Sequence, residues 1–235
     1  MTLTKLLIWA NVAAFGWLVL GAGFGAVDGS APLRFYYDHG ALLGVAVSSG
    51  GQGWRIVSSA FLHGSVIHIG VNMYALYIVG SDVERLMGPV RYVALYAIAM
   101  VGSGLAVVFF DPAVVTLGAS GAIFGLFGAL VGIGLSLLPR GMTIVTQSLP
   151  VIVLNLAIGF AVPGISNTAH IGGLVAGFVA GWLLYQIPSQ RRAAVYAALN
   201  PEQSPVHVET IEHPPDAGPH EEEGAPPLEV RDPRE

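Results

Sequence analysis

The stretch from Gly118 to Gly125 reads GASGAIFG and sets a serine between small residues, where a loop leads into a long apolar run. Glycines at 118 and 121 remove side-chain bulk next to Ser120 and permit a tight backbone turn. A serine in the first turn of a helix is also a common N-cap. The motif therefore leaves two interpretations open, a reactive hydroxyl and a helix cap.

The composition indicates a membrane protein. The chain has 235 residues, of which 54% are hydrophobic and only 11% are charged, whereas soluble domains carry roughly 25% charged residues. It contains no cysteine, which excludes disulfides, cysteine-ligated zinc and thiol catalysis. The predicted fold class is therefore all-α, in the form of a polytopic membrane protein.

Six apolar runs are long enough to cross a bilayer, which takes roughly 20 residues. The first exceeds the apolar core of a cleavable signal peptide, about 7–15 residues, so we interpret it as a span, with a leader peptide as the alternative. After it comes a long semi-polar loop at 27–62, rich in aromatics and expected at the membrane interface. The predicted spans of this membrane domain, residues 1–187, are 4–26, 64–81, 90–110, 119–138, 142–161 and 168–187.

Acidic residues are concentrated near the C-terminus. Residues 188–235 contain ten acidic residues and four arginines, whereas residues 1–187 contain five acidic and six basic residues. The net charge of −5 therefore comes from the C-terminal segment and gives no support to nucleic-acid binding. Because proline and glutamate are the most frequent residues of this segment, we expect a disordered cytoplasmic tail. Its histidines are expected to be solvated instead of metal-bound: His207, His213 and His220.

Basic residues in the loops predict the orientation, because lysine and arginine favour the cytoplasmic side. Six spans put both termini on one side, with six basic residues there against two on the other. The chain is therefore expected to be multi-pass in the cell membrane, with both termini in the cytoplasm. The basic residues are Lys5, Arg85, Arg91, Arg140, Arg191 and Arg192 on the cytoplasmic side, and Arg34 and Arg55 opposite.

Three of the predicted spans begin on the outer side, and each carries polar residues near its start. These are His68 and Asn72 on the second span, Ser120 on the fourth and His170 on the sixth. Polar groups inside a membrane are costly, face the protein interior and tend to be functional. Their common depth favours the reactive interpretation of Ser120.

A serine hydroxyl becomes a good nucleophile when a base accepts its proton, and neutral imidazole suits that role. Between Ser120 and Pro188 the only charged residue is Arg140, so a serine–histidine pair here would work as a dyad without a carboxylate. His68 and Asn72 stand four residues apart, share one helix face and can both donate hydrogen bonds. Such chemistry needs no metal, nucleotide or other cofactor.

Structural interpretations of the same side chains stay open. Asparagine and histidine can bridge helices by hydrogen bonds within a membrane. His63, His68 and His170 could bind zinc, although neither an HExxH motif nor a carboxylate partner accompanies them.

Small residues recur every three or four positions on the fourth and sixth spans, a pattern typical of helices that pack closely in membranes. We expect these faces to meet and to bring Ser120 to His170. The glycines are Gly121, Gly125, Gly128 and Gly132 on the fourth span and Gly173, Gly177 and Gly181 on the sixth.

Over about residues 5–187 the sequence resembles the rhomboid family of intramembrane serine proteases. The family's GxSG motif is matched at 118–121, its second-span HxxxN motif by His68 and Asn72, and its sixth-span histidine before spaced glycines by His170. A Trp-Arg pair at 54–55 and a GxxxExxxG pattern at 80–88, which we interpret as structural, also match.

The resemblance implies that Ser120 is the nucleophile, that His170 is the general base and acid, and that His68 and Asn72 stabilise the oxyanion. It implies a serine endopeptidase that cleaves membrane-protein substrates in or next to their transmembrane segments, through an acyl-enzyme. The partners would be these substrates and the lipid bilayer, and the active site would lie near the outer face.

The resemblance also implies supporting roles for Gly118, Gly121 and Phe124. At the position of Phe124 the family often has tyrosine. Phenylalanine can still stack on His170, but it lacks the hydroxyl. The chain resembles a minimal six-helix member, without a folded cytoplasmic domain before the first span.

Two other function classes remain. Some rhomboid-like proteins only escort membrane clients, but those typically lack the serine or the base. A transporter also places polar residues within the membrane, but at the midplane and between inverted repeats, neither of which is evident here.

Overall fold

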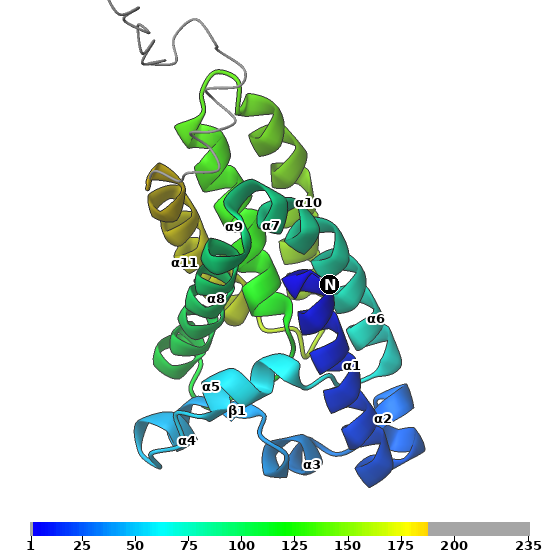
Figure 1. The fold of residues 1–235 in the computed structure, drawn as a ribbon. Helices are drawn as coiled ribbons and strands as arrows, with labels where there is room; N and C mark the ends of the chain where they lie inside the picture. Colours follow the sequence, from blue (N-terminus) through cyan, green and yellow to red (C-terminus); the bar gives the residue numbers. More distant parts are fainter. Residues whose placement is uncertain (1, 188–235) are drawn as a thin grey trace, which may run out of the picture. The chain divides into compact units, whose positions relative to one another are not determined.

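The computed structural model describes residues 2–187, and the predicted acidic tail at 188–235 lies outside the described residues. The described part is built almost entirely of helices, which confirms the all-α prediction (Figure 1). Its longer helices are α1 (Leu3–Ala22), α6 (Val66–Ala75), α7 (Ser81–Met87), α8 (Pro89–Phe110), α9 (Ser120–Ser136), α10 (Met142–Ala161) and α11 (Asn167–Gln186). The shorter elements are α2 (Phe24–Asp28), α3 (Leu33–Asp38), β1 (Leu42–Leu43), α4 (Gly44–Ser48), α5 (Arg55–Ser58), η1 (Ser59–Phe61), η2 (Leu76–Gly80) and β2 (Val115–Thr116).

Each predicted span coincides with an apolar helix, but one of the six is short. Within residues 2–187, five helices of 20–22 residues are long and apolar enough to cross a membrane. The sixth, α9, has 17 residues, which corresponds to about 25 Å. Eleven of its residues are buried, because α8, α10 and α11 pack around it (Figure 1).

The structure corrects two of the predicted boundaries. The first helix ends at Ala22 instead of residue 26, because Gly23 adopts a positive φ of 58° and the short α2 follows. The second helix runs on to Met87 instead of residue 81, through the π-helical turn η2. Polar residues between 81 and 87 end the apolar run without ending the helix, since Asp82 and Arg85 pair on its exposed side.

Glu84, in the middle of α7, joins this helix to the N-terminus of α1. Its carboxylate accepts hydrogen bonds from the backbone N–H groups of Leu3 and Thr4, both at 2.9 Å, and from the Thr4 hydroxyl at 2.7 Å. The first N–H groups of a helix lack partners within the helix, and a negative charge there also suits the helix dipole. This glutamate is the centre of the GxxxExxxG pattern, and the structure agrees with the structural role predicted for it.

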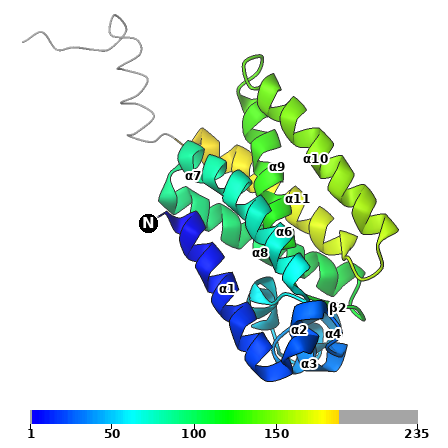
Figure 2. The same cartoon turned by 90° about the vertical axis from the view of Figure 1, so that its right-hand side faces the viewer.

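The segment at 27–62 forms short helices that gather at one end of the long ones (Figure 2). Arg55 holds this segment together: it is only 5% exposed and donates hydrogen bonds to the carbonyls of Tyr37 and Ala41, at 2.7 and 2.9 Å. Its guanidinium also stacks over the rings of Tyr37 and Trp54. β1 pairs with β2 in antiparallel register, Leu42 opposite Thr116, which ties the segment to the loop before α9.

The contact between α9 and α11 depends on glycine. A Cβ atom at Gly177 would overlap the backbone of Gly125, and one at Gly173 would overlap the carbonyl of Gly121. The two backbones therefore approach more closely than any larger residue permits. The expected meeting of the two glycine faces is confirmed.

We predict that Gly177→Ala destabilises the protein by about 1–3 kcal/mol, because the added methyl group forces α9 and α11 apart. Thermal unfolding in detergent measures this as a lower Tm. Gly16→Ala on α1 is the matched control, since no atom lies within 4 Å of the added Cβ, and its Tm should not fall. Equal Tm values for the two variants would contradict a close glycine contact.

Candidate active site

Ser120 is held at the start of α9 by the loop before it. The backbone N–H of Gly118 donates to the carbonyl of Ser59 at 2.9 Å, and Gly118 has a positive φ of 123° that favours glycine. The N-cap position of α9 is occupied by Ala119, with no side-chain capping bond. The Ser120 hydroxyl is therefore not a helix cap, which removes the structural interpretation of the motif.

His170 lies within hydrogen-bond distance of Ser120. Its Nε2 is 2.8 Å from the Ser120 Oγ, although the two residues are 50 positions apart in the sequence. α11 begins at Asn167 and is capped by Ser166, whose hydroxyl accepts from the N–H of Ala169 at 3.2 Å. The cap sets the histidine in the first turn of α11, on the side that faces α9.

The His170 ring is shielded and fixed by packing. Its residue is 7% exposed, and its other nitrogen, Nδ1, has no hydrogen-bond partner among residues 2–187. The ring of Phe124, one turn after Ser120, stacks on it with centroids 4.2 Å apart and planes at 12°. Stacking on one face, rather than a carboxylate, therefore orients this imidazole, as expected for a pair without an acidic partner.

His68 stands on the other side of the Ser120 loop. The backbone N–H of Gly64 donates to its Nδ1 at 3.3 Å. A neutral ring that accepts at Nδ1 carries its proton on Nε2. This Nε2 points at the loop, because a Cβ placed on Gly118 would lie 2.9 Å from it. His68 thus presents a hydrogen-bond donor beside the backbone that leads into Ser120.

Asn72 is buried one turn further along α6, at 6% exposure. Its side-chain NH₂ group donates to the carbonyl of His68 at 2.9 Å. An amide NH₂ group has two protons, so a second donor is left after this bond. The predicted pair therefore occupies the same helix face, with His68 directed at the loop and Asn72 bonded to its own helix.

His63 is a neighbour of the site that sequence reasoning considered only as a zinc ligand. It is fully buried, and its ring packs edge-on against that of His68 with centroids 5.0 Å apart. Burial lowers the pKa of His63 to about 3, so its ring is neutral at physiological pH. Within the described residues no group of three possible ligands lies close enough to hold a metal ion. In the sequence, only the spacing of five residues between His63 and His68 indicated that His63 lies beside the site.

The arrangement combines a hydroxyl, a base and a donor in one place. Ser120 Oγ faces the imidazole that could accept its proton, and the His68 Nε2–H lies beside the same loop. Nucleophile, base and oxyanion donor are the parts that acyl transfer needs. The three predicted helices α6, α9 and α11 supply one part each.

Comparison with known proteins identifies the family of the chain. The family model of the rhomboid domain matches residues 50–187, which is more than half of the chain. The chain therefore belongs to the rhomboid family, and it is an integral multi-pass membrane protein.

Curated relatives carry the same family name. The chain is 36% identical over 160 residues to RHOMBOID-like protein 5 of Arabidopsis thaliana, covering 66% of this chain and 50% of the relative. It is 41% identical over 131 residues to the rhomboid protease GluP of Bacillus subtilis, covering 55% and 26%. It is 35% identical over 141 residues to RHOMBOID-like protein 4 of Arabidopsis thaliana, covering 59% and 36%. The chain thus spans between about a quarter and a half of the length of these relatives.

We predict that Gly118→Ala costs about 1–3 kcal/mol, because an L-residue at this φ is strained and its methyl group presses on His68. The Tm of the protein and the rate at which a fluorophosphonate labels Ser120 should both fall. Gly64→Ala is the control at the same site, where the nearest atom to the added Cβ is 3.8 Å away. A Gly118→Ala protein that labels at the wild-type rate would contradict the role of this turn.

Proposed function

We propose that this protein is an intramembrane serine endopeptidase, which hydrolyses a peptide bond in or next to the transmembrane segment of membrane-protein substrates. The observation that carries the proposal is the 2.8 Å contact between Ser120 Oγ and His170 Nε2. Membership of the rhomboid family and the names of the relatives, among them a rhomboid protease, support it.

In the proposed mechanism His170 accepts the Ser120 proton as the oxygen attacks the peptide carbonyl. The tetrahedral intermediate carries a negative oxygen, which the Nε2–H of His68 and the backbone N–H of Ser120 stabilise, with Asn72 as a further donor. His170 then gives its proton to the leaving amine, which produces the acyl-enzyme. A water molecule, deprotonated by the same imidazole, releases the acid.

A helical substrate hides its carbonyl groups in its own hydrogen bonds, so it must unwind before attack. Small or helix-breaking residues near the scissile bond lower the cost of that step. The proposed site lies at the start of α9 next to the short helices of 27–62, where Trp54 is exposed. Exposed aromatics of this kind favour the membrane interface, where water is available.

We further propose that both termini face the cytoplasm and that the site lies near the outer face of the cell membrane. The support is the distribution of lysine and arginine, six on the side of the termini against two on the other.

Ser120→Ala should abolish labelling by a fluorophosphonate probe, because the probe reacts with an activated serine hydroxyl. Gel fluorescence of the detergent-solubilised protein measures the extent of labelling. Ser136→Ala is the matched control at the opposite end of α9, where the hydroxyl bonds the carbonyl of Ile133 at 2.7 Å. If wild type and Ser120→Ala label equally, Ser120 is not the nucleophile; client binding without any cleavage would favour an escort function instead.

His68→Ala should lower kcat by about 10²–10³-fold with little change in KM, because an oxyanion donor acts mainly in the transition state. Cleavage of a single-span reporter in proteoliposomes gives both constants. Ile67→Ala next to it changes a side chain that is 76% exposed and should leave kcat unchanged. A His68→Ala protein whose loss appears only in KM would contradict the donor role.

A further inference from the structure

Asp111 directly follows α8 and bonds to the helix that carries His170. The hydroxyl of Thr168, in the first turn of α11, donates to the Asp111 carboxylate oxygen Oδ2 at 3.4 Å. Asp111 is half-buried, and within residues 2–187 this is the only hydrogen bond of its side chain. The bond joins two residues that are 57 positions apart, and Thr168 stands two residues before the proposed base.

The other acidic side chains of residues 2–187 have partners elsewhere. Glu84 caps the start of α1, and the remaining three bond within their own turn or helix. These local pairs are Asp28 with Ser30, Asp38 with Arg34, and Asp82 with Arg85. Among the described acidic residues, Asp111 is therefore the one that bonds to α11.

The apolar contact between α8 and α11 sets their separation, but it does not set how far one helix is shifted along the other. A Cβ atom placed on Gly172 would overlap the methyl group of Ala106, so the two helices touch through small groups. Such apolar contacts attract without a preferred direction. A hydrogen bond, in contrast, tolerates only a narrow range of distance and angle. The bond between Asp111 and Thr168 therefore fixes the level of the first turn of α11 against α8.

The end of α8 is itself well anchored. Pro112 follows Asp111 and cannot continue the helix, and its carbonyl accepts a hydrogen bond from the N–H of Val45 at 3.0 Å. A buried apolar cluster joins β1, α8 and α11 beside this turn, and its members are Leu42, Val107 and Ala169. Asp111 thus holds Thr168 from a part of the molecule that three segments fix in place.

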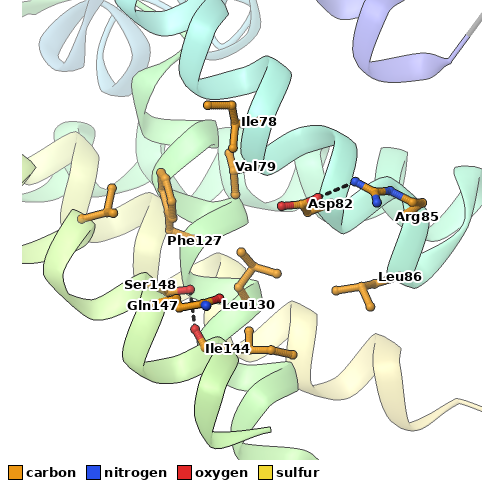
Figure 3. Close-up of a pocket in the computed structure, with 11 residues that line it drawn as sticks. Ile78, Val79, Asp82, Arg85, Leu86, Phe127, Leu130, Ile144, Gln147 and Ser148 are labelled. Carbon is orange, nitrogen blue, oxygen red and sulfur yellow. Dashed lines mark hydrogen bonds and ion pairs between the residues drawn. The ribbon is translucent and has the colours of Figure 1, made fainter.

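α10 offers the first turn of α11 a weaker support. The side chain of Asn167 donates to the carbonyl of Leu156 on α10 at 3.5 Å, a long hydrogen bond. α10 is also open on one side, where a crevice of about 600 Å³ separates it from η2 and α7 (Figure 3). α8, in contrast, packs against both α9 and α11. The support that relates His170 to Ser120 is therefore α8.

We propose that Asp111 is a positioning residue for His170. Thr168 and His170 are two residues apart, so their side chains leave α11 in different directions. By holding Thr168, Asp111 sets the rotation and level of the first turn at which His170 Nε2 meets the Ser120 hydroxyl. The inference rests on the proposed protease function, which gives this pair its role.

The first experiment measures kcat and KM of the full chain in proteoliposomes with a single-span reporter. Asp111→Ala and Thr168→Val should each lower kcat about two- to ten-fold with little change in KM, because each removes one hydrogen bond that places the base. The double variant should be no slower than the single variants, since both remove the same bond. Asp111→Asn should restore most of kcat, because its amide oxygen still accepts from Thr168.

Asp38→Ala is the matched control. Asp38 is an acidic residue whose exposed ion pair with Arg34 contributes little, and its replacement should leave kcat unchanged. Additive losses in the double variant, or an Asp111→Asn protein as slow as Asp111→Ala, would contradict the positioning bond. So would an Asp111→Ala protein that has a lower Tm and a wild-type kcat.

The second experiment does not rely on cleavage. In a Ser120→Ala background, hydrogen–deuterium exchange followed by mass spectrometry reports how often the first turn of α11 opens. Amides of residues 167–171 should exchange faster in Asp111→Ala than in Asp111→Asn, and those of α10 should not differ. Equal exchange in the two variants would overturn the inference. If wild type and Ser120→Ala give the same reporter products, the proposed protease function fails, and the exchange rates still decide whether Asp111 holds the turn.

Discussion

The close approach of α9 and α11 is the contact on which the rest of the structure depends. Lipid tails are as apolar as leucine side chains, so burial alone does not hold helices together in a membrane. Gly121 against Gly173, and Gly125 against Gly177, let the two backbones touch. That contact lies directly below the first turns of both helices, and it sets the 2.8 Å distance between Ser120 and His170.

Two charged side chains, Glu84 and Arg55, bond to backbone groups that the helices leave without partners. Glu84 caps the start of α1, and Arg55 gathers the carbonyls of Tyr37 and Ala41 under the short helices. Both are charged side chains whose partners are mainly backbone groups that no helix could satisfy alone. The Glu84 bonds attach the N-terminus of α1 to α7, and the Arg55 bonds hold the segment at 27–62 together. The pairing of β1 with β2 and the bond from the Gly118 N–H to the Ser59 carbonyl then place the loop before Ser120.

The candidate site is ordered by packing and backbone contacts instead of by a chain of charges. Phe124 stacks on His170, the N–H of Gly64 fixes the tautomer of His68, and the buried ring of His63 supports His68 from behind. Because no carboxylate is needed to orient the imidazole, the site places no extra charge inside the membrane, where isolated charges are costly.

The sequence by itself determined the order and approximate limits of the helices, since apolar runs and glycine spacing are local properties of the chain. It also predicted Ser120, His170, His68 and Asn72 as site residues, because the motifs place them near the starts of three helices. Only the tertiary structure decided what depends on contacts between distant segments. These are the donor direction of His68, the position of His63 beside it and the contact of Ser120 with His170. Each arises where side chains from separate segments meet, and no pattern within one segment encodes such a meeting.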